Sequence, residues 1–232
     1  MTRTPAILNA KALRAVGWRR WLPNAITLSR LVLSAVFFVL AGLWVAPKGA
    51  GWSGGSFSAP DLDLLIAAAC FGIAAGTDAL DGYLARKWGA VTRFGRIMDP
   101  FADKILVVGA FVMLAGPQFN VLGPDGGRLQ ITGVETWMVV VILGRELLVT
   151  SIRAVLEAEG TDFSAQLTGK LKMILQAVAI PVVIVTPAVA SVAAGTTGHL
   201  VVMLTMWLTV AATVASGLPY VVRGLPAFQR ND

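Results

Sequence analysis

The stretch Asp78–Asp103, DALDGYLARKWGAVTRFGRIMDPFAD, holds four aspartates, at positions 78, 81, 99 and 103. It belongs to a chain of 232 residues that is 56% hydrophobic and only 14% charged, with a mean hydropathy of +0.73. Soluble globular proteins carry about 25% charged residues, so this composition indicates a membrane protein. A carboxylate inside a membrane span is energetically expensive and normally faces a polar cavity or a partner. The stretch therefore predicts a functional site where one membrane span ends and the next begins.

Six apolar segments are each about 20 residues or longer, which is enough to cross a hydrocarbon core of about 30 Å. They lie at residues 25–46, 62–87, 98–119, 134–158, 167–188 and 199–222. The predicted fold class is therefore all-α, a polytopic membrane protein with six transmembrane helices in a bundle. Residues 1–23 are expected to form a basic interfacial segment, residues 24–222 the transmembrane domain, and residues 223–232 a short tail.

The lysines and arginines predict how the chain is oriented. They gather in the N-terminal segment, in the 87–97 loop and in the tail, whereas the 189–198 loop holds none. Because basic loops stay on the cytoplasmic side, we expect both termini to be cytoplasmic. The net charge of +6 then reflects topology and contact with membrane lipids. Nucleic-acid binding is disfavoured, since the basic residues flank spans and form no stripe.

The four aspartates form two pairs, each on one helix face. Asp78 and Asp81 are three residues apart on the second predicted helix, and Asp99 and Asp103 are four apart on the third. Because Asp99 precedes Pro100, we expect the third helix to begin there, with Asp99 as N-cap. Other intramembrane polar residues fall in the same, cytoplasmic half: Asn24, Thr27, Arg30, Arg145, Glu146, Thr150, Arg153, Glu157, Lys170 and Lys172. Together they predict one polar cavity that opens to the cytoplasm.

Two interpretations of the aspartates remain open from spacing alone. Each one could cap a helix or pair with a nearby arginine. Four carboxylates close together, however, repel one another, and a divalent cation relieves that repulsion. All-oxygen ligands suit Mg²⁺ or Mn²⁺, whereas a chain with one cysteine (Cys70) and one histidine (His199) is poorly equipped for zinc.

The spacing Asp78-x2-Asp81-Gly82-x2-Ala85-Arg86-x8-Gly95-x3-Asp99-x3-Asp103 resembles the signature of the CDP-alcohol phosphatidyltransferase family. Three further stretches are similar to the bacterial branch of that family that makes phosphatidylglycerophosphate. They are LPNAITLSR (22–30), GRELLVTSIR (144–153) and GKLKMILQAVAIP (169–181). The resemblance covers nearly the whole chain, apart from the external loops and the last helix.

This resemblance implies a six-helix bundle, usually a homodimer, in the bacterial cytoplasmic (inner) membrane, with its active site facing the cytoplasm. It implies a two-metal site (Mg²⁺ or Mn²⁺) held by Asp78, Asp81, Asp99 and Asp103, in which Asp103 also acts as general base. The residues implied to bind CDP-diacylglycerol are Asp78, Asp81, Gly82, Ala85, Arg86 and Gly95.

The implied reaction joins CDP-diacylglycerol and glycerol-3-phosphate into phosphatidylglycerophosphate and releases CMP. Because the acceptor is a dianion, it needs cations, and the candidates are Arg145, Lys170, Arg153 and Lys172. Pairing with glutamates 146, 157 and 159 is the alternative role for these side chains. Within the family, phosphatidylglycerol and inositol phosphate are rival acceptors, and inositol phosphate would use the same cations equally well.

Two functions of other classes are disfavoured. A transporter needs polar residues across the whole membrane, and the outer halves of the predicted spans nearly lack them. The sequence GWSGG at 51–55 matches the serine-hydrolase pattern G-x-S-x-G, but it falls in a glycine-rich loop between spans. That pattern is meaningful only on a strand–turn–helix elbow.

Overall fold

The computed structural model describes residues 10–46, 54–56, 58–88, 93–122, 126–158 and 167–228. Side chains are described within these ranges except at 10–23, 78–88, 93–96, 157–158, 167–168, 170 and 223–228. The described ranges hold six α-helices: α1 (Ala10–Leu43), α2 (Leu62–Trp88), α3 (Arg93–Leu114), α4 (Thr136–Ala158), α5 (Leu167–Val189) and α6 (Thr197–Phe228). A short 3-10 helix (Pro117–Phe119) and two antiparallel strands, β1 (Asn120–Leu122) and β2 (Arg128–Gln130), link α3 to α4.

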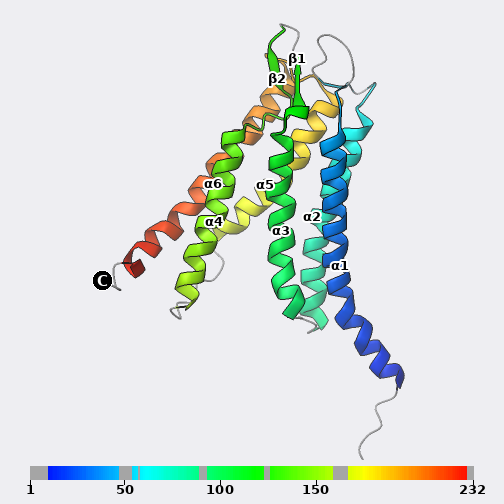
Figure 1. Ribbon diagram of the computed structural model, residues 1–232, viewed down its shortest axis with the longest axis vertical. Coiled ribbons are helices and arrows are strands. Elements are labelled where there is room, and N and C mark those ends of the chain that lie inside the picture. The colour runs from blue at the N-terminus through cyan, green and yellow to red at the C-terminus, as the bar shows by residue number, and fades with distance from the viewer. Residues whose placement is uncertain are drawn as a thin grey trace, which may run out of the picture.

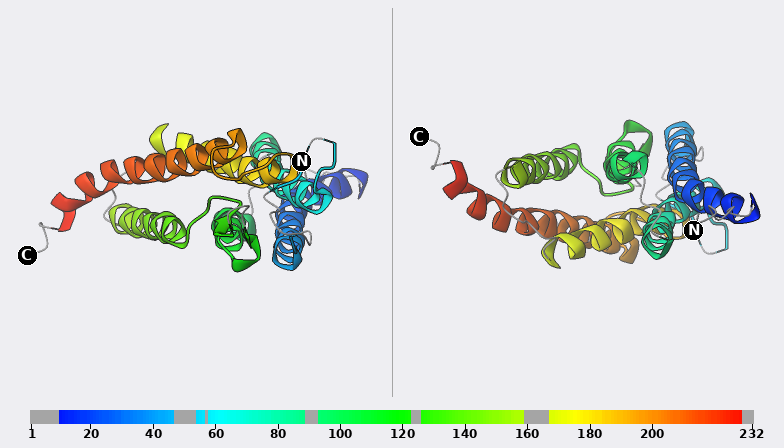
Figure 2. Two further views of the ribbon diagram at one scale, coloured as in Figure 1. Left: turned by 90° about the horizontal axis from the view of Figure 1, so that it is seen from above. Right: turned by 90° about the horizontal axis from the view of Figure 1, so that it is seen from below.

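The helices alternate in direction along a long, flat molecule (Figure 1). α1, α3 and α5 run toward the β1–β2 hairpin, and α2, α4 and α6 run away from it. We call the end with the strands the hairpin end. α1 packs on α2 and α3, while α5 packs on α2 and α6, and α4 leans on α6. Seen along the helices, α5 and α6 form one side, with α3 and α4 opposite them (Figure 2).

The predicted helical fold is confirmed, with shifted boundaries. Each of the six predicted segments corresponds to one of the helices α1–α6. α1, however, is continuous from Ala10 across the expected boundary at residue 23, and α6 extends to Phe228, into the expected tail. The prediction missed the β1–β2 hairpin, because three-residue strands are too short to show a clear alternation of apolar and polar residues.

The prediction that Asp99 caps the start of the third helix is wrong. α3 begins at Arg93, and Pro100 lies inside it. An Asp-Pro pair is typical of a helix start, because proline lacks the N–H that an interior position donates and disfavours helical geometry in the residue before it. Here the helix continues through both residues. Because Pro100 has no N–H, the carbonyl of Arg96 lacks the helical hydrogen bond that residue 100 would otherwise donate. The carboxylate of Asp99 is therefore not used as a cap.

The described helices make this an integral membrane protein. Three segments are long and apolar enough to span a bilayer, namely Asn24–Leu43, Leu171–Val189 and Thr197–Val222. The apolar part of α2, Leu62–Thr77, is shorter. Many large apolar side chains face outward, such as Leu43 and Val140, which are 75% and 64% exposed. These outward faces suit contact with lipid chains.

The apolar core contains buried side chains from all six helices and extends into the hairpin end. Phe37 of α1 meets Phe71 of α2 edge to face, with ring centroids 5.6 Å apart. Trp44, just after α1, stacks on Phe119 at 5.1 Å. Because lipid chains are as apolar as these side chains, close van der Waals packing, and not escape from water, holds such helices together. The aromatic contacts therefore set the spacing of α1 and α2.

Asp61 joins three elements at the hairpin end. Its Oδ1 accepts a hydrogen bond from the backbone N–H of Leu64 (3.1 Å) and so caps α2, and its Oδ2 accepts one from Trp44 Nε1 (3.1 Å). Its own backbone N–H donates to the carbonyl of Ala188, 2.8 Å away, in α5. This one residue thus ties the end of α1 and the start of α2 to the end of α5.

The described glycines of the GWSGG stretch have a packing role. Gly55 donates its N–H to the carbonyl of Pro187 (2.8 Å), and a Cβ on Gly55 would lie 2.2 Å from the carbonyl oxygen of Ala188. Gly54 has a φ of +142° and lies equally close to Ala190. The loop can approach the end of α5 only because both positions lack a side chain. Ser53 lies outside the described residues.

Asp61→Ala is expected to lower the free energy of unfolding by about 1–2 kcal/mol, because it removes both the cap of α2 and the bond from Trp44. Asp63→Ala is the matched control, since Asp63 is exposed in the first turn of the same helix. Titration with a denaturing detergent in mixed micelles, followed by circular dichroism, measures both. Equal losses in the two variants would contradict the assigned role of Asp61.

Candidate active site

Asp99 of α3 is held by α1. The hydroxyl of Thr27 donates a hydrogen bond of 2.7 Å to Asp99 Oδ1, across 72 positions of the sequence. Thr27 is only 2% exposed, so this bond is shielded from solvent. The sequence marked Thr27 as an intramembrane polar residue but gave it no partner. The structure shows that it fixes the orientation of one of the four motif aspartates.

Asp103 lies one turn after Asp99 on α3. It lies near enough to Lys172 of α5 for the two opposite charges to attract each other. Lys172 is 5% exposed, although lysines are almost never fully buried without a partner. The aspartate side of the site is thus connected electrostatically to a buried cation on another helix.

Three charged side chains form a buried group that we call the cation cluster: Arg145 and Glu146 of α4 and Lys172 of α5. Arg145 Nη1 donates to Glu146 Oε1 at 3.2 Å, and Lys172 Nζ donates to the same oxygen. The side chains of Arg145, Glu146 and Lys172 are only 11%, 15% and 6% exposed. Two cations share one carboxylate, so the cluster carries an excess positive charge.

Lys104 connects α3 to α4 beside this cluster. Its Nζ donates to Thr150 Oγ1 at 2.6 Å, and the Thr150 hydroxyl in turn donates to the carbonyl of Glu146 at 2.7 Å. Lys104 directly follows Asp103 in the chain. Lys104 was not among the predicted site residues, although its place inside DPFADK next to a motif aspartate was a usable signal.

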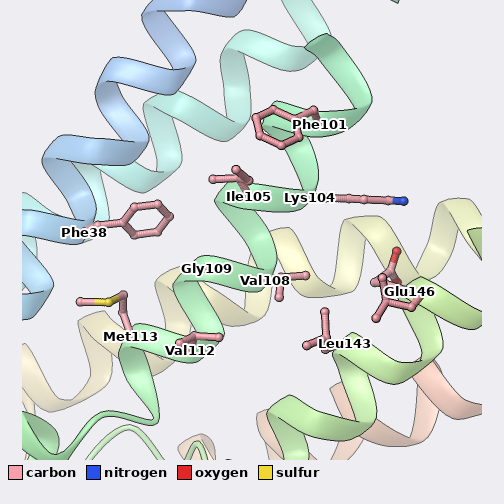
Figure 3. A pocket seen from close by; sticks show the side chains of 11 residues that line it. Phe38, Phe101, Lys104, Ile105, Val108, Gly109, Val112, Met113, Leu143 and Glu146 are labelled. Atoms are coloured by element: carbon pink, nitrogen blue, oxygen red, sulfur yellow. The ribbon is translucent and has the colours of Figure 1, made fainter. Parts of the chain in front are cut away.

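An apolar pocket of about 480 Å³ lies between α1, α3 and α4 (Figure 3). Apolar side chains such as Phe38, Val112 and Leu143 form most of its wall. Lys104 and Glu146 line it too, and Figure 3 shows them on the same side of the pocket. Because Glu146 belongs to both, the pocket adjoins the cation cluster.

The remaining predicted residues are placed only by their backbone. Asp78, Asp81, Gly82, Ala85 and Arg86 lie in the last turns of α2, Gly95 lies in the first turn of α3, and Lys170 opens α5. Their side chains, and that of Glu157, fall outside the described part. α2 and α3 run antiparallel, so both aspartate pairs belong to the end opposite the hairpin end (Figure 1).

The predicted cations can be compared with the alternative of glutamate pairing. Arg145 and Lys172 do pair with a glutamate, and for both it is Glu146. Arg153 is exposed on α4, two turns beyond Arg145. Among the described side chains no three metal-ligating groups come together, and these include only two of the four motif aspartates. The phosphate-binding roles and the metal site therefore stay predictions.

Comparison with known proteins shows the family of this chain. It matches the family model of the CDP-alcohol phosphatidyltransferases over residues 20–215. A Bacillus subtilis protein named CDP-diacylglycerol–glycerol-3-phosphate 3-phosphatidyltransferase is 34% identical over 212 residues, which cover 91% of this chain and 98% of the relative. A probable phosphatidylglycerophosphate synthase of Mycobacterium tuberculosis is 35% identical over 204 residues, covering 88% and 81%. The chain belongs to the CDP-alcohol phosphatidyltransferase family, as the aspartate pattern predicted.

Glu146→Gln is expected to lower the free energy of unfolding by about 3 kcal/mol, because it leaves two buried cations without their shared counter-charge. Glu135→Gln is the control, since Glu135 is exposed just before α4 and should shift stability by less than about 0.5 kcal/mol. Both free energies come from denaturing-detergent titrations of the purified variants. A loss at position 146 no larger than at 135 would show that the cluster does not stabilise the fold.

Proposed function

We propose that this chain transfers the phosphatidyl group from CDP-diacylglycerol to glycerol-3-phosphate, giving phosphatidylglycerophosphate and CMP. The observation that carries the choice of acceptor is the cation cluster: it has an excess positive charge, and one of its cations, Lys172, is close enough to Asp103 for the two charges to attract each other. The names of the Bacillus subtilis and Mycobacterium tuberculosis relatives agree with this reaction.

The four aspartates would hold two divalent cations. The donor set fits, because carboxylate oxygens are the ligands that Mg²⁺ and Mn²⁺ prefer. The bond from Thr27 adds support, because ligating carboxylates are normally oriented by a hydrogen bond from outside the ligand set. When bound, the metals would neutralise charge on the pyrophosphate and stabilise the leaving phosphate. Arg86 and the small residues Gly82, Ala85 and Gly95 would hold the nucleotide.

In the proposed reaction, Asp103 accepts the proton of the acceptor hydroxyl as general base. The hydroxyl oxygen forms a bond to the β-phosphorus, which carries the diacylglycerol group. The bond from that phosphorus to the oxygen bridging the two phosphates breaks, and CMP leaves with this oxygen. Lys172, which attracts Asp103, keeps the base next to the acceptor site.

The acceptor phosphate would bind the cation cluster. Arg145 presents a planar guanidinium that can grip a phosphate through two N–H donors, and Lys172 adds a second charge. Arg145 and Lys172 together carry two positive charges, and Glu146 neutralises only one of them. A phosphate dianion would supply the negative charge that is still missing. Lys170, two residues before Lys172, and Arg153 on α4 would complete the cation set at the membrane surface.

The six helices would all span the membrane, with both termini and the site on the cytoplasmic side. The strictly alternating helix directions support this arrangement, because an even number of spans returns the chain to its starting side. An amphiphilic donor could keep its acyl chains in the inner leaflet while its nucleotide reaches the aspartates. The apolar pocket beside the cation cluster suits such a molecule. The homodimer implied by the family resemblance stays a prediction.

CMP release by the purified protein in detergent tests this function. CDP-diacylglycerol is supplied with Mg²⁺ or Mn²⁺, and glycerol-3-phosphate, phosphatidylglycerol and inositol phosphate are offered separately. We expect release only with glycerol-3-phosphate, and none after EDTA. Release with inositol phosphate alone would keep the aspartate chemistry and overturn the acceptor; release that survives EDTA would overturn the metal site.

Thr27→Val is expected to raise the metal concentration for half-maximal activity about 10–100-fold, because Asp99 loses the hydrogen bond that orients it. Thr27→Ser keeps the hydroxyl and should stay within about threefold of the unchanged protein. Titration of CMP release with Mn²⁺ measures both variants. If valine and serine behave alike, Thr27 has no part in holding the metal ligand.

A further inference from the structure

The last helix contacts the cation cluster through one short face. Ser216, Gly217 and Tyr220 lie within one turn of α6 and are all buried, with Ser216 and Tyr220 4% and 5% exposed. We call these three residues the α6 wall. The family match ends at residue 215, and none of the predicted site residues lies on α6. The available signal was Tyr220 itself, one of only two tyrosines in the chain.

Each member of the wall touches Arg145 in a different way. Arg145 Nη2 donates a hydrogen bond of 3.3 Å to the backbone carbonyl of Ser216. The guanidinium carbon lies 5.9 Å from the centroid of the Tyr220 ring, within the range of a cation–π contact. A Cβ added to Gly217 would lie 3.3 Å from Arg145 Cγ, so the arginine stem passes close over this glycine.

The hydrogen bond from the wall uses a different guanidinium nitrogen from the bond to Glu146: Nη2 donates to Ser216, whereas Nη1 donates to Glu146. A guanidinium binds a phosphate well only when its plane is correctly presented, and a flexible arginine loses side-chain entropy on binding. The carbonyl of Ser216 fixes one edge of the plane, and the Tyr220 ring supports the group. Without the wall, only Glu146 among the described hydrogen-bond partners would orient Arg145.

The wall is itself held in position against α5. Gln176 of α5 donates to the hydroxyl of Thr213, 3.2 Å away, one turn before the wall. The Tyr220 hydroxyl lies close to α5 at Gly169, where an added Cβ would be 3.5 Å from its oxygen. Tyr220 therefore stands between Arg145 on α4 and the start of α5, which also carries Lys170 and Lys172.

We propose that the α6 wall is a positioning element for the acceptor: Tyr220, Gly217 and Ser216 hold Arg145 in the orientation that binds the acceptor phosphate. The inference rests on the proposed acceptor role of Arg145. In this proposal the wall acts through Arg145 and not on the donor lipid. Its loss should therefore weaken acceptor binding and leave donor binding unchanged.

Tyr220→Leu removes the ring and tests the wall directly. We expect the KM for glycerol-3-phosphate to rise about tenfold, with the KM for CDP-diacylglycerol within about twofold. Tyr220→Phe keeps the ring and should restore the acceptor KM to within about twofold. Leu218→Ala, on the exposed face of the same turn, should change neither KM. Equal increases in both KM values, or no rescue by phenylalanine, would overturn the role of the ring.

Gly217→Ala gives an independent test if the tyrosine variants fold poorly. The added methyl group crowds the stem of Arg145 and should raise the acceptor KM about threefold or more. Gly144→Ala on α4 is the matched control, since a methyl group there meets nothing within 4 Å. An unchanged acceptor KM in Gly217→Ala would mean that the glycine does not position Arg145.

Arg145→Lys separates this inference from the proposed function. If Arg145→Lys raises the acceptor KM and Tyr220→Leu adds nothing further in the double variant, the wall acts through Arg145. If the two effects multiply, Tyr220 acts elsewhere and the inference is wrong while the acceptor role of Arg145 stands. If Arg145→Lys leaves the acceptor KM unchanged, the acceptor site itself is wrong, and the wall has no such role.

Discussion

The pairing of buried charges is the constraint on which this structure depends. Arg145 and Lys172 lie in an apolar bundle and share the single carboxylate of Glu146. An ion taken out of water is stabilised only when its partners are close and well oriented, so the helices that carry these residues cannot shift independently. α4 and α5 must meet at this level, and α6 must supply the carbonyl of Ser216. The contacts that build the site are therefore also the contacts that fix the packing of this half of the bundle.

The motif aspartates and Lys172 lie toward the end opposite the hairpin end, and the two ends are built differently. At the hairpin end, aromatic stacking and the side-chain and backbone hydrogen bonds of Asp61 tie α1, α2 and α5 together. Toward the other end, polar side chains link the helices: Thr27 to Asp99 between α1 and α3, Lys104 to Thr150 between α3 and α4. A tightly packed end thus holds the helices, while the opposite end can carry groups that bind polar substrates.

Much of the candidate site was predictable because it is encoded locally. The aspartate pairs follow from spacing on a helix, and the six helical segments follow from hydropathy. Two local signals misled the prediction. The Asp99-Pro100 pair looks like a helix start, yet α3 continues through it, so Asp99 orients toward Thr27. The short strands of the hairpin carry too few residues to form a readable pattern.

The sequence by itself determined that this is a helical membrane protein of the CDP-alcohol phosphatidyltransferase family, with its aspartates near the ends of two consecutive helices. Hydropathy and motif spacing are properties of residues that are near one another in the chain, so they can be recognised without knowing the fold. Only the tertiary structure decided which partners each charge has. It joined Thr27 to Asp99, Lys172 to Glu146, and Tyr220 of α6 to Arg145. Such contacts depend on how whole helices pack, because residues 26 to 75 positions apart meet only when the bundle has formed.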